Sequence, residues 1–170
     1  KYCSVHIEFL CGEPFMYPKF NELIFELSKM HTLRITTNLS MNIYDFAKRL
    51  DCNRVKVTPT FHPVFADLNI FLYKIKLLKQ MGFSDYVCYL AYPPQIKLIN
   101  FYREKFSKQD IPLSVMMFWG EHNGIKYPAG YTKEELIIIK GALAMCCGEE
   151  FQIDKKNDFK GKLCNAGRYY

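Results

Sequence analysis

The hydrophobic positions of this chain switch repeatedly between the spacing of a strand and the spacing of a helix. Val5, Ile7 and Phe9 alternate with polar residues, which is typical of a strand that buries one side. Phe20 and Ile24 then begin a stripe with helical spacing. The alternation occurs five times, with strands predicted over residues 3–10, 33–37, 55–60, 86–91 and 113–119 and helical stripes over residues 20–27, 43–50, 71–78, 96–106 and 136–143.

Each predicted strand ends in a polar turn or a turn rich in glycine and proline. Strands that alternate with helices favour parallel pairing, because the helix returns the chain to the same edge of the sheet. The carboxyl ends of the strands then gather at one rim, which is where α/β proteins carry their chemistry. The turns fall at residues 11–14, 37–38, 61–63, 92–94 and 120–124, and the residues expected near the rim are Leu10, Thr37, Thr60, Ala91 and Trp119.

The length of the repeat indicates how much of a barrel is present. A unit of roughly 24 to 30 residues matches one βα unit, since eight such units take about 250 residues. Five units are too few to close an ordinary barrel, so we expect an open α/β sheet with an exposed edge at its first strand. We assign residues 1–147 to this partial barrel and residues 148–170 to a polar linker and a separate short segment.

Composition and charge narrow the class of protein. The 170 residues are 49% hydrophobic and 24% charged, which suits one globular domain. No apolar run is long enough to cross a membrane, and the start of the chain does not have the order of a signal peptide. Seven cysteines without disulfide spacing favour reduced thiols and a cytoplasmic location. The lysines behind the net charge of +6 are spread along the chain, which favours a solvated surface over a nucleic-acid partner.

The turns carry a resemblance to a known family. Cys11-Gly12-Glu13-Pro14 after the first strand resembles the Gly-Gly-Glu-Pro motif on the second strand of radical S-adenosylmethionine enzymes. Thr37-Asn38 resembles the end of the family's third strand, usually Thr-Asn-Gly, and Thr60-Phe61-His62-Pro63 is similar to a Ser-Phe-His-Pro turn after the fourth. Cys164-Asn165-Ala166-Gly167 resembles the opening of the C-terminal extension called SPASM.

The resemblance implies a fold, a cofactor site and a reaction. The fold would be a partial (β/α)6 TIM-like barrel made of strands two to six, with the first βα unit missing. Glu13 would receive the amino group of S-adenosylmethionine, and a [4Fe–4S] cluster would cleave this cofactor to a 5′-deoxyadenosyl radical. Cys164 would be a metal ligand of an auxiliary iron–sulfur cluster, and the substrate would be a peptide, protein or sugar. The residues implied at the cofactor are Gly12, Glu13, Pro14, Thr37, Asn38 and His62.

The sequence departs from the family at its defining motif. The family holds its cluster with Cys-x3-Cys-x2-Cys after the first strand, and no three cysteines here have that spacing. Cys3 lies on the first predicted strand, which corresponds to the family's second, and Cys11 lies at its end. Neither stands where the family has its cluster ligands, so we expect the fragment to be inactive by itself. Cys11 and Leu39 also stand where the family has glycine. The remaining cysteines are interpreted as small buried residues: Cys3, Cys52, Cys88, Cys146 and Cys147.

Other interpretations of the same residues stay open. Glu13 could be a turn residue stabilised by a helix dipole, Asn38 could end a strand, and His62 could cap a turn. Trp119, His122, Tyr127 and Tyr131 could line the mouth of the site or simply pack together. The chain could also be a non-catalytic binding module, or a βα-barrel enzyme that uses Glu13 and His62 as acid and base. A Cys-x3-Cys-x2-Cys motif in the DNA upstream of Lys1 would favour the radical enzyme.

Overall fold

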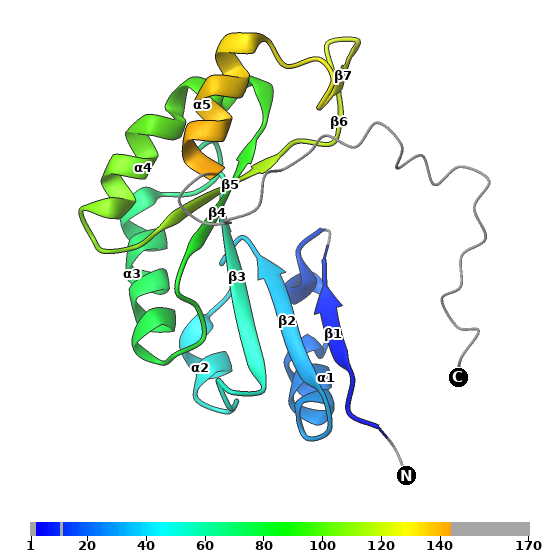
Figure 1. The fold of residues 1–170 in the computed structure, drawn as a ribbon. Helices are drawn as coiled ribbons and strands as arrows, with labels where there is room; N and C mark the ends of the chain where they lie inside the picture. Colours follow the sequence, from blue (N-terminus) through cyan, green and yellow to red (C-terminus); the bar gives the residue numbers. More distant parts are fainter. Residues whose placement is uncertain (1–2, 11, 144–170) are drawn as a thin grey trace, which may run out of the picture.

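The fold is an open parallel sheet whose successive strands are joined through helices (Figure 1). The computed structural model describes residues 3–10 and 12–143. Over these residues the main sheet has five strands in chain order, and every neighbouring pair is parallel. The strands are β1 (His6–Phe9), β2 (Thr32–Thr37), β3 (Val55–Phe61), β4 (Val87–Ala91) and β5 (Leu113–Met117).

The helices follow the strands and cover one face of the sheet. Helices α1, α3 and α4 contact strands β2, β3 and β5, respectively, and α5 contacts both β5 and α4. Thr132 and Glu135 form a capping box at the start of α5, because each accepts a hydrogen bond from the other's backbone amide. The helical segments are η1 (Pro14–Met16), α1 (Phe20–Ser28), α2 (Ile43–Ala47), α3 (Leu68–Gln80), η2 (Pro93–Leu98), α4 (Ile99–Ser107) and α5 (Lys133–Leu143).

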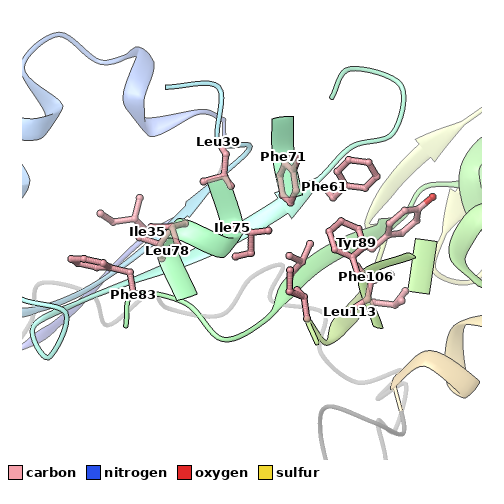
Figure 2. Packing of buried hydrophobic residues seen from close by; sticks show 14 of the residues in the cluster. Ile35, Leu39, Phe61, Phe71, Ile75, Leu78, Phe83, Tyr89, Phe106 and Leu113 are labelled. Atoms are coloured by element: carbon pink, nitrogen blue, oxygen red, sulfur yellow. The ribbon is translucent and has the colours of Figure 1, made fainter. Parts of the chain in front are cut away.

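The core lies between the helices and the sheet (Figure 2). Alternate residues of β2 and β3 face this layer, and four of them are apolar and buried: Leu33, Ile35, Val55 and Val57. Phe61 is at its centre: its ring makes edge-to-face contacts with rings on α3 and α4, with centroids 4.9–5.3 Å apart. Aromatic packing of this kind fixes the end of β3 against two helices.

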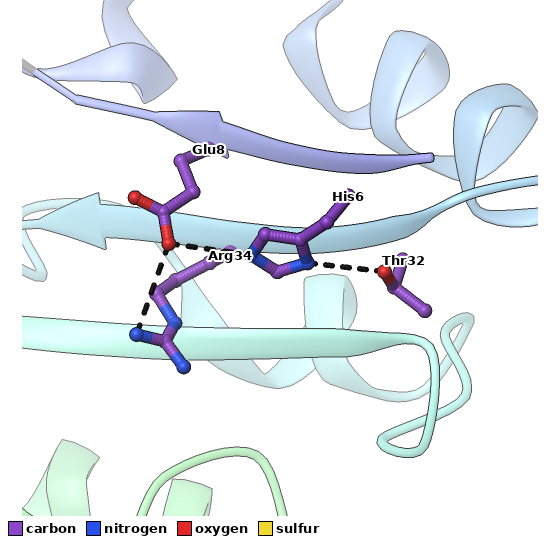
Figure 3. Close-up of polar contacts among 4 residues, drawn as sticks. All are labelled: His6, Glu8, Thr32 and Arg34. Atoms are coloured by element: carbon purple, nitrogen blue, oxygen red, sulfur yellow. Dashed lines mark hydrogen bonds and ion pairs between the residues drawn. The ribbon is translucent and has the colours of Figure 1, made fainter. Parts of the chain in front are cut away.

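The opposite face of the sheet is polar near the start of the strands. Glu8, Arg34 and Lys56 lie side by side on three neighbouring strands. The Glu8 carboxylate lies 3.2 Å from His6 Nε2 and 3.8 Å from Arg34 Nη1, and the other ring nitrogen of His6 lies 3.0 Å from Thr32 Oγ1 (Figure 3). These groups are exposed, so each pair contributes about 0–1 kcal/mol to stability.

The predicted order of five parallel strands is confirmed, and the chain is an α/β protein. The sheet is not closed, and the barrel stays a prediction. Thr37 and Ala91 are the last residues of β2 and β4, and Thr60 is the last but one of β3, so the rim prediction holds for these three strands. Leu10 directly follows the end of β1, whereas Trp119 lies two residues beyond the end of β5. None of the helices in the described ranges is long and apolar enough to cross a membrane.

The prediction of a strand to Trp119 followed by a simple turn was wrong. Strand β5 ends at Met117, and the next residues form an antiparallel hairpin of β6 (Gly120–His122) and β7 (Ile125–Tyr127). Asn123 and Gly124 link these strands with φ values of 51° and 76°. Asparagine followed by glycine suits such a turn because both tolerate positive φ. Trp119 consequently lies outside the sheet and is exposed.

Candidate functional site

The first component of the site is the turn after β1. Gly12 has a φ of 62°, a left-handed conformation that glycine adopts without strain. The turn places Glu13 at the cap of η1, where its carboxylate accepts a hydrogen bond of 3.2 Å from the Phe15 amide. Pro14 occupies the first position of η1, where its missing N–H costs no hydrogen bond. Glu13 therefore caps η1, and its role at a cofactor stays a prediction.

The second component is the end of β2, which lies beside the end of β1 because the two strands are parallel. The Thr37 hydroxyl donates a hydrogen bond of 2.8 Å to Glu13 Oε1, and the Asn38 amide donates one of 2.7 Å to Glu13 Oε2. These partners are 24 and 25 residues from Glu13 in the sequence. The structure thus joins two of the predicted motifs through a single carboxylate. We call Glu13, Thr37 and Asn38 the carboxylate clip.

The carboxylate clip retains capacity to bind a ligand. A carboxylate has about four acceptor positions, and the three hydrogen bonds to Glu13 leave one on Oε2. Glu13 is half-buried and Asn38 is exposed. Apart from Gly12 and its chain neighbours, no atom of the described residues lies within 4 Å of the place where a side chain on Gly12 would begin. The Glu13 carboxylate follows a glycine whose backbone a ligand can approach closely. This combination suits a small cation such as an ammonium group.

His62 is hydrogen-bonded within its own turn. Its carbonyl accepts hydrogen bonds from the amides of Phe65 and Ala66, which closes the turn after β3. No hydrogen bond in the described ranges links its ring to Glu13, Thr37 or Asn38. The predicted role of His62 at the cofactor, and its pairing with Glu13 as acid and base, stay predictions that this geometry does not support directly.

The pH dependence of stability should report the environment of His62. Burial lowers the pKa of its imidazole below the ordinary value of 6.5. The unfolded chain then binds a proton more readily than the folded one, so the stabilisation from His62 is complete above that value and is lost as the pH falls below it. We expect the free energy of unfolding, measured with urea between about pH 7.5 and about pH 5, to decline more steeply in the parent than in His62→Gln. Parallel declines would show that the imidazole is solvated.

The aromatic residues at the rim pack together. The buried Tyr131 hydroxyl donates to the Ala91 carbonyl and accepts from the Phe118 amide, both at 2.8 Å. The Tyr127 ring packs against that of Tyr131 at a tilt of 60°, with ring centroids 4.9 Å apart. These contacts support the packing interpretation for both tyrosines. Burial raises the pKa of the Tyr131 phenol, which keeps it a neutral donor.

One partner in this group could not be predicted from the sequence. The Tyr92 hydroxyl, just after β4, lies 2.9 Å from His122 Nδ1 on β6, so the hairpin is held to the end of β4. Nothing in the local pattern around Tyr92 distinguishes it from other aromatic residues that follow a strand.

The structure tests only some of the predictions for the cysteines, because several of them lie outside the described residues. Cys88 is buried as expected, but the same interpretation is wrong for Cys3, which is exposed in the segment before β1. Within the described ranges no three histidine, cysteine, aspartate or glutamate side chains gather, so this part of the chain offers no ligand set for a cluster. Cys11, Cys146, Cys147 and Cys164 lie outside the described residues, as does the predicted linker and extension.

Comparison with known proteins yields no match for this chain, whether to family models, curated proteins or solved structures. Its function is therefore inferred from the motifs of the sequence and from the geometry that joins them.

Proposed function

We propose that the chain is part of a radical S-adenosylmethionine enzyme and that the carboxylate clip binds the ammonium group of the cofactor. The observation that carries this proposal is the contact between two separate motifs. Glu13 of the Gly-Glu-Pro turn accepts hydrogen bonds from Thr37 and Asn38 at the end of the next strand. The resemblance implies that both motifs border the cofactor, and the contact between them is consistent with this.

The backbone at residue 39 gives further support. The family has glycine after Thr-Asn, whereas this chain has Leu39, which is buried and has a φ of 58°. A bulky residue is seldom found in this left-handed conformation, while glycine adopts it readily. The turn therefore has the shape expected of a Thr-Asn-Gly sequence although the glycine is absent. The five parallel strands in chain order are compatible with strands two to six of a partial (β/α)6 barrel.

The residues of this chain would bind and orient the cofactor. Glu13 Oε2 would accept a hydrogen bond from the ammonium group, and Gly12 would let the methionine part approach the backbone. The Thr37 hydroxyl and the Asn38 amide would hold the carboxylate in place. The bound cofactor would supply the radical that removes a hydrogen atom from the substrate. A cluster ligand at Cys164, a location in the cytoplasm and a peptide, protein or sugar substrate belong to the same proposal.

Replacing Glu13 with glutamine should weaken cofactor binding. The change removes the charge that faces the ammonium group, and a charge-assisted hydrogen bond is worth about 1.5–3 kcal/mol, so the Kd should rise roughly tenfold or more. The measurement is calorimetric titration of S-adenosylmethionine into the full-length protein after anaerobic reconstitution with iron and sulfide, with 5′-deoxyadenosine formation followed in parallel.

Two further variants separate binding from folding in this experiment. Glu13→Gln places an NH2 group where the carboxylate accepts hydrogen bonds, so it also lowers stability. Thr37→Val removes one hydrogen bond to Glu13 but keeps the charge, and should lose stability while retaining most of the affinity. Glu8→Gln, on the same strand but in the exposed polar group, should change neither. An unchanged Kd in Glu13→Gln, or no cofactor cleavage by the parent, would contradict the proposal.

A further inference from the structure

A cavity lies at the other edge of the sheet from the carboxylate clip. It has a volume of about 440 Å³ and is bordered by α4 and by the segment that leads into β5. Asn100, Arg103 and Ser107 lie on the side of α4 that faces it, since residues three, four and seven apart share one face of a helix. Asp110 and Pro112 lie on the opposite wall. This cavity has no part in the proposed cofactor site.

The guanidinium group of Arg103 is the unusual feature of this cavity. Its Nε and Nη2 atoms are buried, and neither has a hydrogen-bond partner among residues 3–10 and 12–143. A buried cationic donor without a partner is costly, because it has lost its water and gained nothing in exchange. Such groups are normally paired, so an unpaired one at a cavity wall indicates a missing anionic partner.

The nearby carboxylates already have other partners. Glu104 lies 2.6 Å from the Lys108 ammonium, and Asp110 lies 2.8 Å from that of Lys79. Both lysines lower the pKa of the carboxyl that they contact. Neither acid is bonded to Arg103, although both border the cavity. The charge of Arg103 is thus not neutralised by the acidic groups beside it.

We propose that this cavity binds a ligand through an oxyanion, a carboxylate or a phosphate, held by Arg103. The planar guanidinium group presents donors in a fork that matches two oxygens of either anion. Asn100 and Ser107, one turn before and after Arg103 on α4, add an amide and a hydroxyl that can donate to the same ligand. The volume is in the range of sites for small molecules.

The test measures anion binding by the full 170-residue chain in buffer free of oxyanions. Inorganic phosphate and malonate serve as the probes, each at constant ionic strength, and binding is followed by titration calorimetry and by Tm. We expect saturable binding of at least one probe by the parent and a Kd roughly tenfold or more higher in Arg103→Met. Arg54→Met makes the same change at an exposed arginine and should bind like the parent. Binding of malonate alone indicates a carboxylate ligand, and binding of phosphate alone indicates a phosphate ester.

A second measurement asks whether the guanidinium group is unpaired in the ligand-free protein. Without oxyanions, Arg103→Met should raise the Tm by several degrees, roughly 3–8 °C, because an apolar side chain replaces a buried charge without a partner. Arg54→Met should leave the Tm nearly unchanged. A lower Tm in Arg103→Met would mean that the chain itself neutralises Arg103, and it would overturn the proposal. So would the absence of saturable binding of both probes by the parent.

Discussion

Phe61→Ala is expected to lower the free energy of unfolding by about 3–5 kcal/mol, one of the two largest effects that we predict for this protein. Phe61 is 1% exposed and its ring contacts those of Phe71, Tyr102 and Phe106. Truncation to alanine removes these contacts and leaves a cavity between β3 and two helices. Because the surrounding rings belong to rigid elements, the cavity cannot close fully. The loss is measured from urea unfolding curves.

The matched control is Phe65→Ala, four residues along the chain. Phe65 is 89% exposed, so the same chemical change should alter stability by no more than about 0.5 kcal/mol. A cost for Phe61→Ala below about 1.5 kcal/mol would mean that the core at the end of β3 is loosely packed. The arrangement of β3 against α3 and α4 would then need revision.

Tyr131→Phe should cost about 2–4 kcal/mol although it removes only one oxygen atom. The hydroxyl accepts a hydrogen bond from the Phe118 amide and donates one to the Ala91 carbonyl. Its loss leaves both backbone groups without this partner, and each unsatisfied buried group costs about 1–3 kcal/mol. The variant should therefore unfold at a lower urea concentration with an unchanged slope, since the surface exposed on unfolding is the same.

Tyr127→Phe is the control for this prediction. Tyr127 packs against the Tyr131 ring, but none of the hydrogen bonds in the described ranges involves its hydroxyl. Its removal should leave stability within about 0.5 kcal/mol of the parent. Equal effects of the two substitutions would show that water replaces the Tyr131 hydroxyl, and that the ends of β4 and β5 are open to solvent.

The order of the elements could be predicted because it is encoded locally. Apolar spacing distinguishes strand from helix, and the alternation of the two requires parallel pairing. The meeting of Glu13 with Thr37 also follows from this order, since successive parallel strands end side by side. The capping box at Thr132 and Glu135 is local too, because its two residues are three positions apart in the sequence.

Features that depend on distant partners could not be predicted. Tyr131 is one of several tyrosines in the sequence, and only the fold places its hydroxyl between β4 and β5. The hairpin after β5 was not predicted because Gly120 and Asn123-Gly124 were interpreted together as one turn over residues 120–124. Arg103 fits a helical pattern as an ordinary solvated residue, and its lack of a partner emerges only once the helix is packed.

The position of β1 has a consequence for the dynamics of the carboxylate clip. In the described part of the chain β1 pairs only with β2, and none of its residues is fully buried. Amide hydrogen exchange should therefore be fastest along β1 and slowest along the central β3, because an edge strand opens without unfolding the rest. Each opening of β1 separates Glu13 from Thr37 and Asn38. A ligand that bridges the two strand ends would slow exchange in both, and would make the edge of the sheet part of the cooperative unit.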